Sequence, residues 1–280
     1  MIPAPFEYIR AGSVGEAVSA LAQHGDEAKV LAGGHSLLPL MKLRFAAPSL
    51  LVDIGRIDAL KGVREDGDGI VVGAATTHAA VMKDPLVLQH CPVLAHVTAG
   101  VGDPQVRHRG TLGGSLAHGD AAGDLPATAL ALDARFVAQG PNGQRTIEAS
   151  DFFVDYLETA LNPDEVLVEV AFPKLDSSWG YNYQKFTRVA QAWAIVGALA
   201  IARRTNGSIE ASIGLTNMAT VPIRASATES ALASGSSIED AAAQAAEGTD
   251  PPTDLNADPD YRQHLARVLT RRALEKAVGG

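Results

Sequence analysis

Residues 32–44 read AGGHSLLPLMKLR and follow directly on a short apolar run at residues 30–32, which predicts a buried strand. Further along the chain, residues 102–118 read GDPQVRHRGTLGGSLAH. Each stretch holds a pair of adjacent glycines, Gly33–Gly34 and Gly113–Gly114. Paired glycines allow positive φ angles and close approach of a ligand to the main chain, so successive amide groups can form an anion-binding nest. A long ligand with a pyrophosphate needs two such loops, because one loop alone cannot define its orientation.

The two glycine loops differ from the common nucleotide-binding motifs. Neither loop, 32–36 or 111–115, contains a lysine, which excludes a Walker A site, and neither matches the dinucleotide fingerprint G-x-G-x-x-G. The hydroxyl groups of Ser36, Thr111 and Ser115 can add donors to phosphate oxygens. Either glycine pair alone could equally be an ordinary tight turn. Both together, each beside apolar segments and small hydroxyl residues, favour ligand binding.

The composition limits the class of protein. A chain of 280 residues suffices for one large or two modest domains, and 46% apolar with 20% charged residues is typical of a soluble globular protein. The net charge of −9 argues against a nucleic-acid-binding protein, because such proteins usually carry an excess of basic residues. Cys91 is the only cysteine, which excludes an internal disulfide and an iron–sulfur cluster held by this chain alone. With no long apolar run and no signal-peptide pattern, we expect a cytoplasmic protein.

Local patterns predict an α+β fold. A capping box at residues 13–16 opens a helix that Gly25 ends, and Thr77 is a candidate cap for a second helix. Strands are expected at 30–32, 50–54, 69–73, 135–137, 146–148 and 165–172, and then in a meander at 181–187, 194–203 and 209–216. Residues 194–201 could be helical on their alanine content, but the Asn206–Gly207 turn favours a strand. A domain boundary is expected near residues 173–179, and a closing helix at 261–278.

Residues 32–44 and 102–118 resemble the two flavin-binding loops of the medium, FAD-carrying subunit of molybdenum hydroxylases, in particular of the carbon monoxide dehydrogenase type. The resemblance continues through residues 151–153, 172–173 and 261–274. It implies an α+β, FAD-binding fold of the vanillyl-alcohol-oxidase (PCMH) type in residues 1–175, with subdomains at about 1–56 and 57–175. It also implies a C-terminal domain, residues 176–280, of three strands and a helical bundle.

By matching motif positions, the resemblance also implies a set of cofactor-binding residues. These are Ala32, Gly33, Gly34, His35, Ser36, Leu37, Thr77, Gly102, Thr111, Gly113, Gly114, Ser115, Asp124, Leu167, Lys185 and Trp193. The two glycine loops would hold the pyrophosphate, while Leu167 and Lys185 would line the flavin ring. FAD is expected to bind non-covalently, and none of the histidines has a spacing typical of a metal site.

Three of these residues have an alternative role each. Lys185 would stabilise negative charge on a reduced flavin, or would be a solvated lysine on an edge strand. Asp124 would accept hydrogen bonds from ribose or ribityl hydroxyls, or would cap the helix that follows it. Trp193 stands where related chains often carry tyrosine. It would shield the flavin face, or would be a core tryptophan.

The resemblance implies an electron-transfer subunit with no catalytic acid or base of its own. Electrons would come from the [2Fe–2S] clusters of a small partner subunit, and a large partner subunit would carry the molybdenum cofactor. The acceptor would be a quinone or NAD, and the complex would be a dimer of heterotrimers, cytoplasmic or held at the inner face of the membrane. The substrate of the complex stays open between carbon monoxide, an N-heterocycle and an aldehyde.

Two alternatives come from other classes of protein. The first is a self-sufficient FAD-dependent oxidase or reductase of the same fold, which would need its own proton-handling group, such as His78 or Tyr181. The second is a nucleotide-binding module without enzymatic activity.

Overall fold

A small parallel sheet forms the first part of the chain in the computed structural model, which describes residues 2–205 and 207–279. Its strand order is β1-β3-β2. The elements are β1 (Glu7–Arg10), α1 (Val14–His24), β2 (Ala28–Leu31), α2 (Leu37–Leu43) and β3 (Leu50–Asp53). The predicted helix cap is confirmed, because the Ser13 hydroxyl accepts from the Glu16 amide, while the Glu16 carboxylate accepts from the amide of Gly12, one residue before the N-cap. The sequence did not predict β1, whose side chains are mostly exposed.

A five-stranded antiparallel sheet of order β4-β5-β10-β6-β7 follows. Its strands are β4 (Val63–Asp66), β5 (Gly69–Gly73), β6 (Arg135–Gly140), β7 (Gly143–Glu148) and β10 (Val166–Pro173). The helices between β5 and β6 are α3 (His78–Val81), α4 (Pro85–His90), α5 (Pro92–Ala99), α6 (Pro104–Arg109), α7 (Leu112–His118) and α8 (Asp124–Ala131). After β7 come α9 (Ala149–Phe152) and a hairpin of β8 (Phe153–Asp155) and β9 (Glu158–Thr159).

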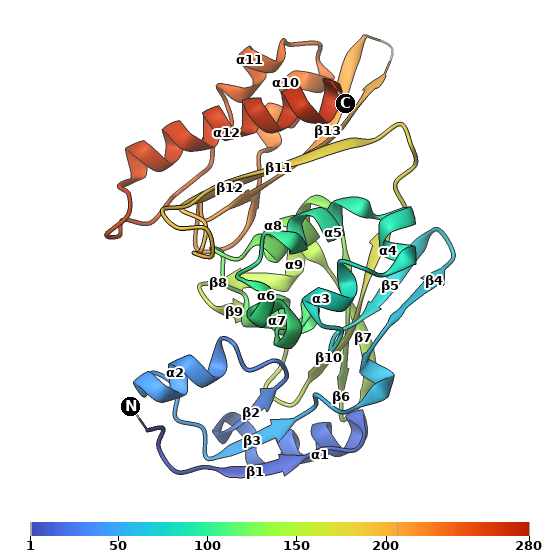
Figure 1. Ribbon diagram of the computed structural model, residues 1–280, viewed down its shortest axis with the longest axis vertical. Helices are drawn as coiled ribbons and strands as arrows, with labels where there is room; N and C mark the ends of the chain where they lie inside the picture. Colours follow the sequence, from blue (N-terminus) through green and yellow to red (C-terminus); the bar gives the residue numbers. More distant parts are fainter. Residues whose placement is uncertain (1, 206, 280) are drawn as a thin grey trace.

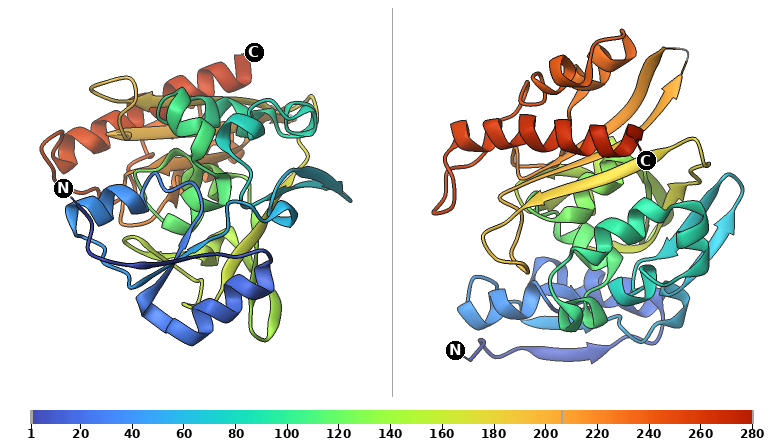
Figure 2. Two further views of the ribbon diagram at one scale, coloured as in Figure 1. Left: turned by 60° about the horizontal axis from the view of Figure 1, so that its bottom comes forward. Right: turned by 45° about the horizontal axis from the view of Figure 1, so that its top comes forward.

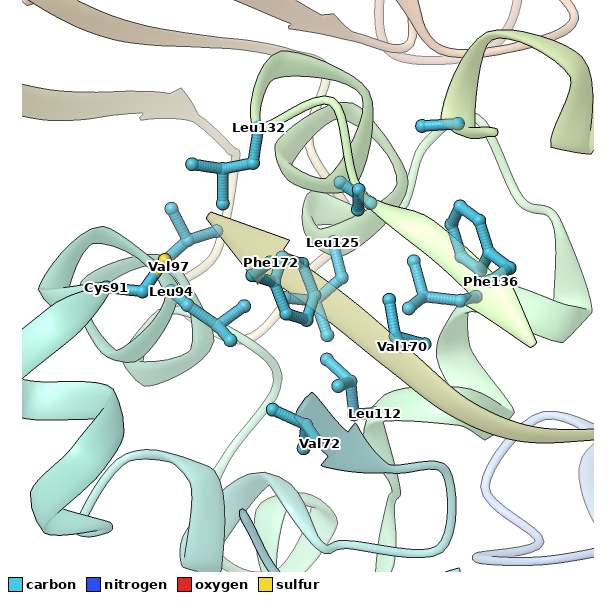
Figure 3. Packing of buried hydrophobic residues seen from close by; sticks show 14 of the residues in the cluster. Val72, Cys91, Leu94, Val97, Leu112, Leu125, Leu132, Phe136, Val170 and Phe172 are labelled. Atoms are coloured by element: carbon cyan, nitrogen blue, oxygen red, sulfur yellow. The ribbon is translucent and has the colours of Figure 1, made fainter. Parts of the chain in front are cut away.

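Strand β10 is buried on both faces because it separates two hydrophobic cores. Leu167, Val170 and Phe172 pack with the helices, in the core that Figure 3 shows, and Val166 and Val168 pack with α1 and the small sheet. Cys91 belongs to the first core, and its burial raises the pKa of its thiol to about 12. Cys91 therefore stays protonated and acts as a small apolar side chain in this core.

The C-terminal part is an antiparallel sheet of order β11-β12-β13-β14 with three helices. Its elements are β11 (Gly180–Phe186), β12 (Val196–Thr205), β13 (Ser208–Thr216), β14 (Ile223–Arg224), α10 (Ser226–Ala233), α11 (Ile238–Ala242) and α12 (Pro259–Gly279). The preference for a strand at 194–203 is confirmed, while Asn206 of the predicted turn lies outside the described residues. The expected three-stranded sheet gains a fourth, two-residue strand, β14, which is too short to leave a periodic signal.

The C-terminal sheet lies between two layers of helices. Helix α12 crosses β11 and β12 on one face, and α8 and α5 contact the other face (Figures 1 and 2). At Gly180 a Cβ atom would overlap the carbonyl oxygen of Ala277, so the glycine lets α12 approach β11 closely. No helix among the described residues is both long and apolar enough to cross a membrane.

We expect Phe172→Ala to lower the free energy of unfolding by about 3–5 kcal/mol, because a large ring is removed from the core of β10. Phe45→Ala is the control, since Phe45 is 81% exposed and its loss should change stability by about 0.5 kcal/mol or less. Urea unfolding followed by circular dichroism measures both. Equal effects of the two substitutions would contradict the assignment of this core.

Candidate functional site

A cleft of about 680 Å³ brings together segments that are far apart in the sequence. Its walls come from the β2–α2 loop, from the segment that joins α6 to α7, from residues 157–167, and from Lys185 and residues 191–193 of the C-terminal part. All of the predicted cofactor-binding residues line this cleft except Thr77. The Thr77 hydroxyl instead accepts a hydrogen bond from the Ala80 amide and caps α3, which is the helix-cap role that the sequence also predicted.

The first glycine loop offers open amide groups. The amides of residues 33–37 donate no hydrogen bond to any described part of the chain. Gly34 has φ +76°, a backbone conformation that a side chain rarely tolerates. Unpaired amides in a cleft suit a ligand with several negatively charged oxygens. The amides of this loop are therefore free to donate to a ligand, as the expectation of an anion-binding nest requires.

The second glycine loop uses its amides inside the protein. Thr111 caps α7 by accepting from the Gly114 amide at 3.0 Å. The amides of Leu112 and Gly113 donate to the carbonyls of Thr76 and Ala74, both at 2.9 Å. The expectation of an open nest in this loop is wrong, because the loop is tied to the end of β5.

The two glycine loops touch each other. A Cβ atom on Gly33 would overlap the carbonyl of Arg109 and would lie 2.7 Å from the Cα of Gly110. Gly114 faces the first loop, and its added Cβ would lie 3.8 Å from the Cβ of Ala32. The glycines thus bring the open amides of one loop beside the fixed backbone of the other.

A buried ion pair joins the C-terminal sheet to the cleft wall. Lys185 on β11 places its Nζ 2.7 Å from Oδ2 of Asp124, at the start of α8, and 3.2 Å from the carbonyl oxygen of Gly100. The Tyr183 hydroxyl donates to Oδ1 of Asp124 at 2.6 Å. Burial raises the pKa of Asp124, although Lys185 and Tyr183 oppose this shift. Both alternative roles are wrong, because Gly123 is the N-cap of α8 and Lys185 is largely buried.

Trp193 lies on the segment between β11 and β12, lines the cleft and is 57% exposed, so the alternative of a core tryptophan is wrong. The Ile195 amide donates to the Phe186 carbonyl at 2.9 Å and closes this segment. Arg262 of α12 donates to the Ile195 carbonyl and is fully buried. Sequence patterns did not reveal Arg262, because arginine on a surface helix usually faces solvent.

His78 is a cleft residue that the motif positions did not include. Its side chain is 3% exposed, and a Cβ on Gly110 would lie 2.9 Å from its ring. Its Nδ1 is buried without a hydrogen-bond partner among the described residues. Burial, with smaller effects of Arg107 and His35, lowers the pKa of His78 to about 4. His78 is therefore neutral at physiological pH and packs behind the contact between the two glycine loops.

Comparison with known proteins shows the family to which the chain belongs. The family described as "FAD binding domain in molybdopterin dehydrogenase" matches residues 4–175, and the family described as "CO dehydrogenase flavoprotein C-terminal domain" matches residues 181–277. The chain belongs to the FAD-binding medium subunits of molybdenum hydroxylases. The resemblance that the sequence motifs suggested is thus confirmed, and with it the oxidoreductase class.

This FAD-binding subunit has relatives of similar length. It is 42% identical to the carbon monoxide dehydrogenase medium chain of Hydrogenophaga pseudoflava, over 99% of this chain and 98% of that one. It is 37% identical to the 6-hydroxypseudooxynicotine dehydrogenase complex subunit alpha of Paenarthrobacter nicotinovorans, over 99% and 96% of the two chains.

The fold of the FAD-binding subunit is shared with solved structures. A chain of carbon monoxide dehydrogenase from Hydrogenophaga pseudoflava superposes with a TM-score of 0.96 at 44% identity, covering 99% of this chain and 98% of that one. A chain of quinoline 2-oxidoreductase from Pseudomonas putida 86 gives 0.93 at 33% identity, covering 99% and 98%. The predicted fold class is confirmed.

The residues of the cleft fit FAD. Its volume lies in the range of about 300–1,000 Å³ that is typical of small-molecule sites. The open amides of residues 33–37 suit a diphosphate, and the hydroxyls of Ser36 and Ser115 lie in the same lining. Leu167 and Trp193 add apolar surface of the kind that a flavin ring requires.

We expect the free energy of unfolding to fall between pH 7 and pH 5, in part because His78 is buried in its neutral form. Its folded pKa of about 4 lies below the 6.5 of the unfolded chain, so its contribution is present above about pH 6.5 and is lost as the pH falls toward 4. At 1.36 kcal/mol per pKa unit, this amounts to about 2 kcal/mol at pH 5. His78→Gln should lack this part of the loss. Urea unfolding at both pH values measures it, and an equal pH dependence in the variant would contradict the assignment.

Proposed function

We propose that this chain is the FAD-carrying electron-transfer subunit of a molybdenum hydroxylase complex. In this role it takes electrons from the [2Fe–2S] clusters of a partner subunit and passes them to an external acceptor, a quinone or NAD. The observation that carries the proposal is the cleft, where the unpaired amides of residues 33–37 lie beside the second glycine loop. The medium-chain relatives support it.

The residues of the cleft have separate roles in this proposal. The amides of residues 33–37 hold the diphosphate, with hydroxyl donors from Ser36 and Ser115. Leu167, Lys185 and Trp193 line the flavin ring, and Gly102, His35 and Thr111 complete the lining. Bound FAD would supply a centre that accepts electrons singly or in pairs. The protein binds it, orients it and sets the charge around it.

The iron–sulfur clusters and the molybdenum cofactor belong, in this proposal, to partner subunits. Cys91 is the only cysteine of the chain and it is buried, so the chain cannot supply the several thiolates that a cluster requires. Substrate oxidation then takes place on a large subunit. The names of the relatives, which include a medium chain and a subunit of a dehydrogenase complex, support a heteromeric assembly.

Domain organisation, assembly and location extend the proposal. Residues 1–175 form the FAD-binding domain, with subdomains at about 1–56 and 57–175, and residues 176–280 cover the cleft and contribute Lys185 and Trp193 to it. The chain assembles with a large and a small subunit as a dimer of heterotrimers. The complex works in the cytoplasm, free or at the inner face of the membrane.

The test of the proposal uses the purified chain and FAD. We expect a yellow protein with one FAD per chain and no turnover of aldehydes, N-heterocycles or carbon monoxide by the chain alone. Co-expression with candidate large and small subunits should give a complex whose flavin is reduced by substrate. A protein that fails to bind FAD would contradict the proposal, and substrate turnover by the chain alone would favour a self-sufficient oxidase.

Gly114→Leu should abolish FAD binding while the chain stays folded. Its side chain would extend past Ala32 from the lining of the cleft and would compete with the diphosphate, which is expected at the open amides of residues 33–37. Gly33 is less suitable for this test, because any side chain there would strike the backbone of Arg109 and disturb the fold.

The control for Gly114→Leu shows whether loss of a helix cap alone changes FAD binding. A Cβ on Gly114 would lie 2.7 Å from the Thr111 hydroxyl, so the cap of α7 would lose about 1 kcal/mol. Ser237→Ala removes a comparable cap from α11, at a residue that does not line the cleft, and should leave FAD content unchanged. Equilibrium dialysis with FAD measures both variants. Full FAD content in Gly114→Leu would exclude this cleft as the site.

A further inference from the structure

Tyr183 belongs to a hydrogen-bonded chain behind the cleft. Its hydroxyl donates to Oδ1 of Asp124 at 2.6 Å and lies 3.4 Å from the hydroxyl of Thr216 on β13. The other carboxylate oxygen of Asp124 accepts from Nζ of Lys185 at 2.7 Å. Asp124 and Lys185 line the cleft, whereas Tyr183 does not. The two oxygens of Asp124 are thus held by two residues of the same strand, β11.

The neighbouring strand makes room for the Tyr183 hydroxyl. Gly197 on β12 pairs with Lys185 of β11 and with Thr216 of β13. A Cβ atom on Gly197 would overlap the Tyr183 hydroxyl and would lie 2.9 Å from the Cβ of Thr216. Because Gly197 does not have a positive φ, space and not backbone conformation requires glycine here.

We propose that Tyr183 is a positioning residue, which acts through Asp124 to hold the Lys185 ammonium group at the wall of the cofactor cleft. This inference rests on the proposed function. Asp124 alone could rotate about its side-chain torsions, but a carboxylate held at both oxygens has one orientation. The Lys185 ammonium is then fixed between that carboxylate and the Gly100 carbonyl at the end of α5.

The arrangement also sets the charge that a bound cofactor meets. The pair of Asp124 and Lys185 is close to neutral overall, with its positive end on a side chain that keeps 14% of its surface exposed. A hydrogen bond to a charged group is stronger than one between neutral groups, so the Tyr183 hydroxyl helps Asp124 to stay ionised. Loss of that hydroxyl loosens the ion pair without removing any group that lines the cleft.

The experiment is a double-mutant cycle on FAD affinity, measured by quenching of FAD fluorescence in the full chain. We expect Tyr183→Phe to weaken FAD binding about tenfold, which corresponds to the loss of one charged hydrogen bond. Lys185→Met should weaken it at least as much. In the Lys185→Met background, Tyr183→Phe should have no further effect, because both residues act through one ammonium group.

Tyr8→Phe is the matched control. The Tyr8 hydroxyl donates to Asp53 at 2.5 Å, so this variant also removes a bond between tyrosine and aspartate, but in the N-terminal sheet. Its FAD affinity should equal that of the wild type. Circular dichroism confirms folding of each variant. If Tyr183→Phe does not fold, Asp124→Asn replaces it in the same cycle with the same expected non-additivity.

The outcomes separate this inference from the proposed function. Absence of FAD binding by the wild type would overturn both. Normal binding by the wild type with an unchanged affinity in Tyr183→Phe would overturn the positioning role alone. Additive effects of Tyr183→Phe and Lys185→Met would also overturn it, since Tyr183 would then act on the fold and not through Lys185.

Discussion

The contact between Gly33 and the backbone of Arg109 and Gly110 is the constraint on which the cleft depends. Because Gly33 has no side chain, the first glycine loop can lie directly against the second. Any Cβ atom at this position would overlap the backbone of Arg109 and Gly110. The second loop is tied in turn to the end of β5 through the carbonyls of Ala74 and Thr76. The second loop, held by these hydrogen bonds, supports the first loop. The amides of residues 33–37 make no hydrogen bond within the described protein and can donate to a ligand.

The same cleft is completed from the far end of the sequence by a buried ion pair. Burial of two charges costs much of what their attraction returns, so such a pair is weak evidence for stability. The pair instead fixes the relative positions of the two residues, because separating them or removing one would leave an uncompensated buried charge. Asp124 and Lys185 therefore couple the position of β11 to α8, and with it the segment that carries Trp193. The C-terminal part thus contributes side chains to the lining of the cleft.

Much of this could be predicted from the sequence where the signal is local. The helix cap at Ser13 and the strands at residues 135–137 and 146–148, which lie within β6 and β7, depend on neighbouring residues, and the sequence predicted them. The glycine loops were found because two glycine pairs, each beside apolar segments and small hydroxyl residues, favour ligand binding more than either pair does alone. Strand β1 was missed because its exposed side chains show no alternation.

Other features arise only from tertiary contacts. Asp124 and Lys185 were both expected at the cofactor site, with a helix cap and a solvated lysine as the alternatives, and nothing in either neighbourhood shows that they meet. His78 and Arg262 are buried by segments distant in sequence. The amides of the second glycine loop donate to carbonyls of the segment that follows β5, which no local pattern predicts. The sequence could therefore identify residues that line the cleft, but not how they are paired.

Hydrogen–deuterium exchange of the purified chain, with and without FAD, tests the central claim most directly. The account predicts that the amides of residues 33–37 exchange rapidly in the free chain, since they have no partner among the described residues, and become protected when FAD is added. The amides of Leu112 and Gly113, which already donate within the protein, should change little. Bound FAD with no protection of residues 33–37 would contradict the account.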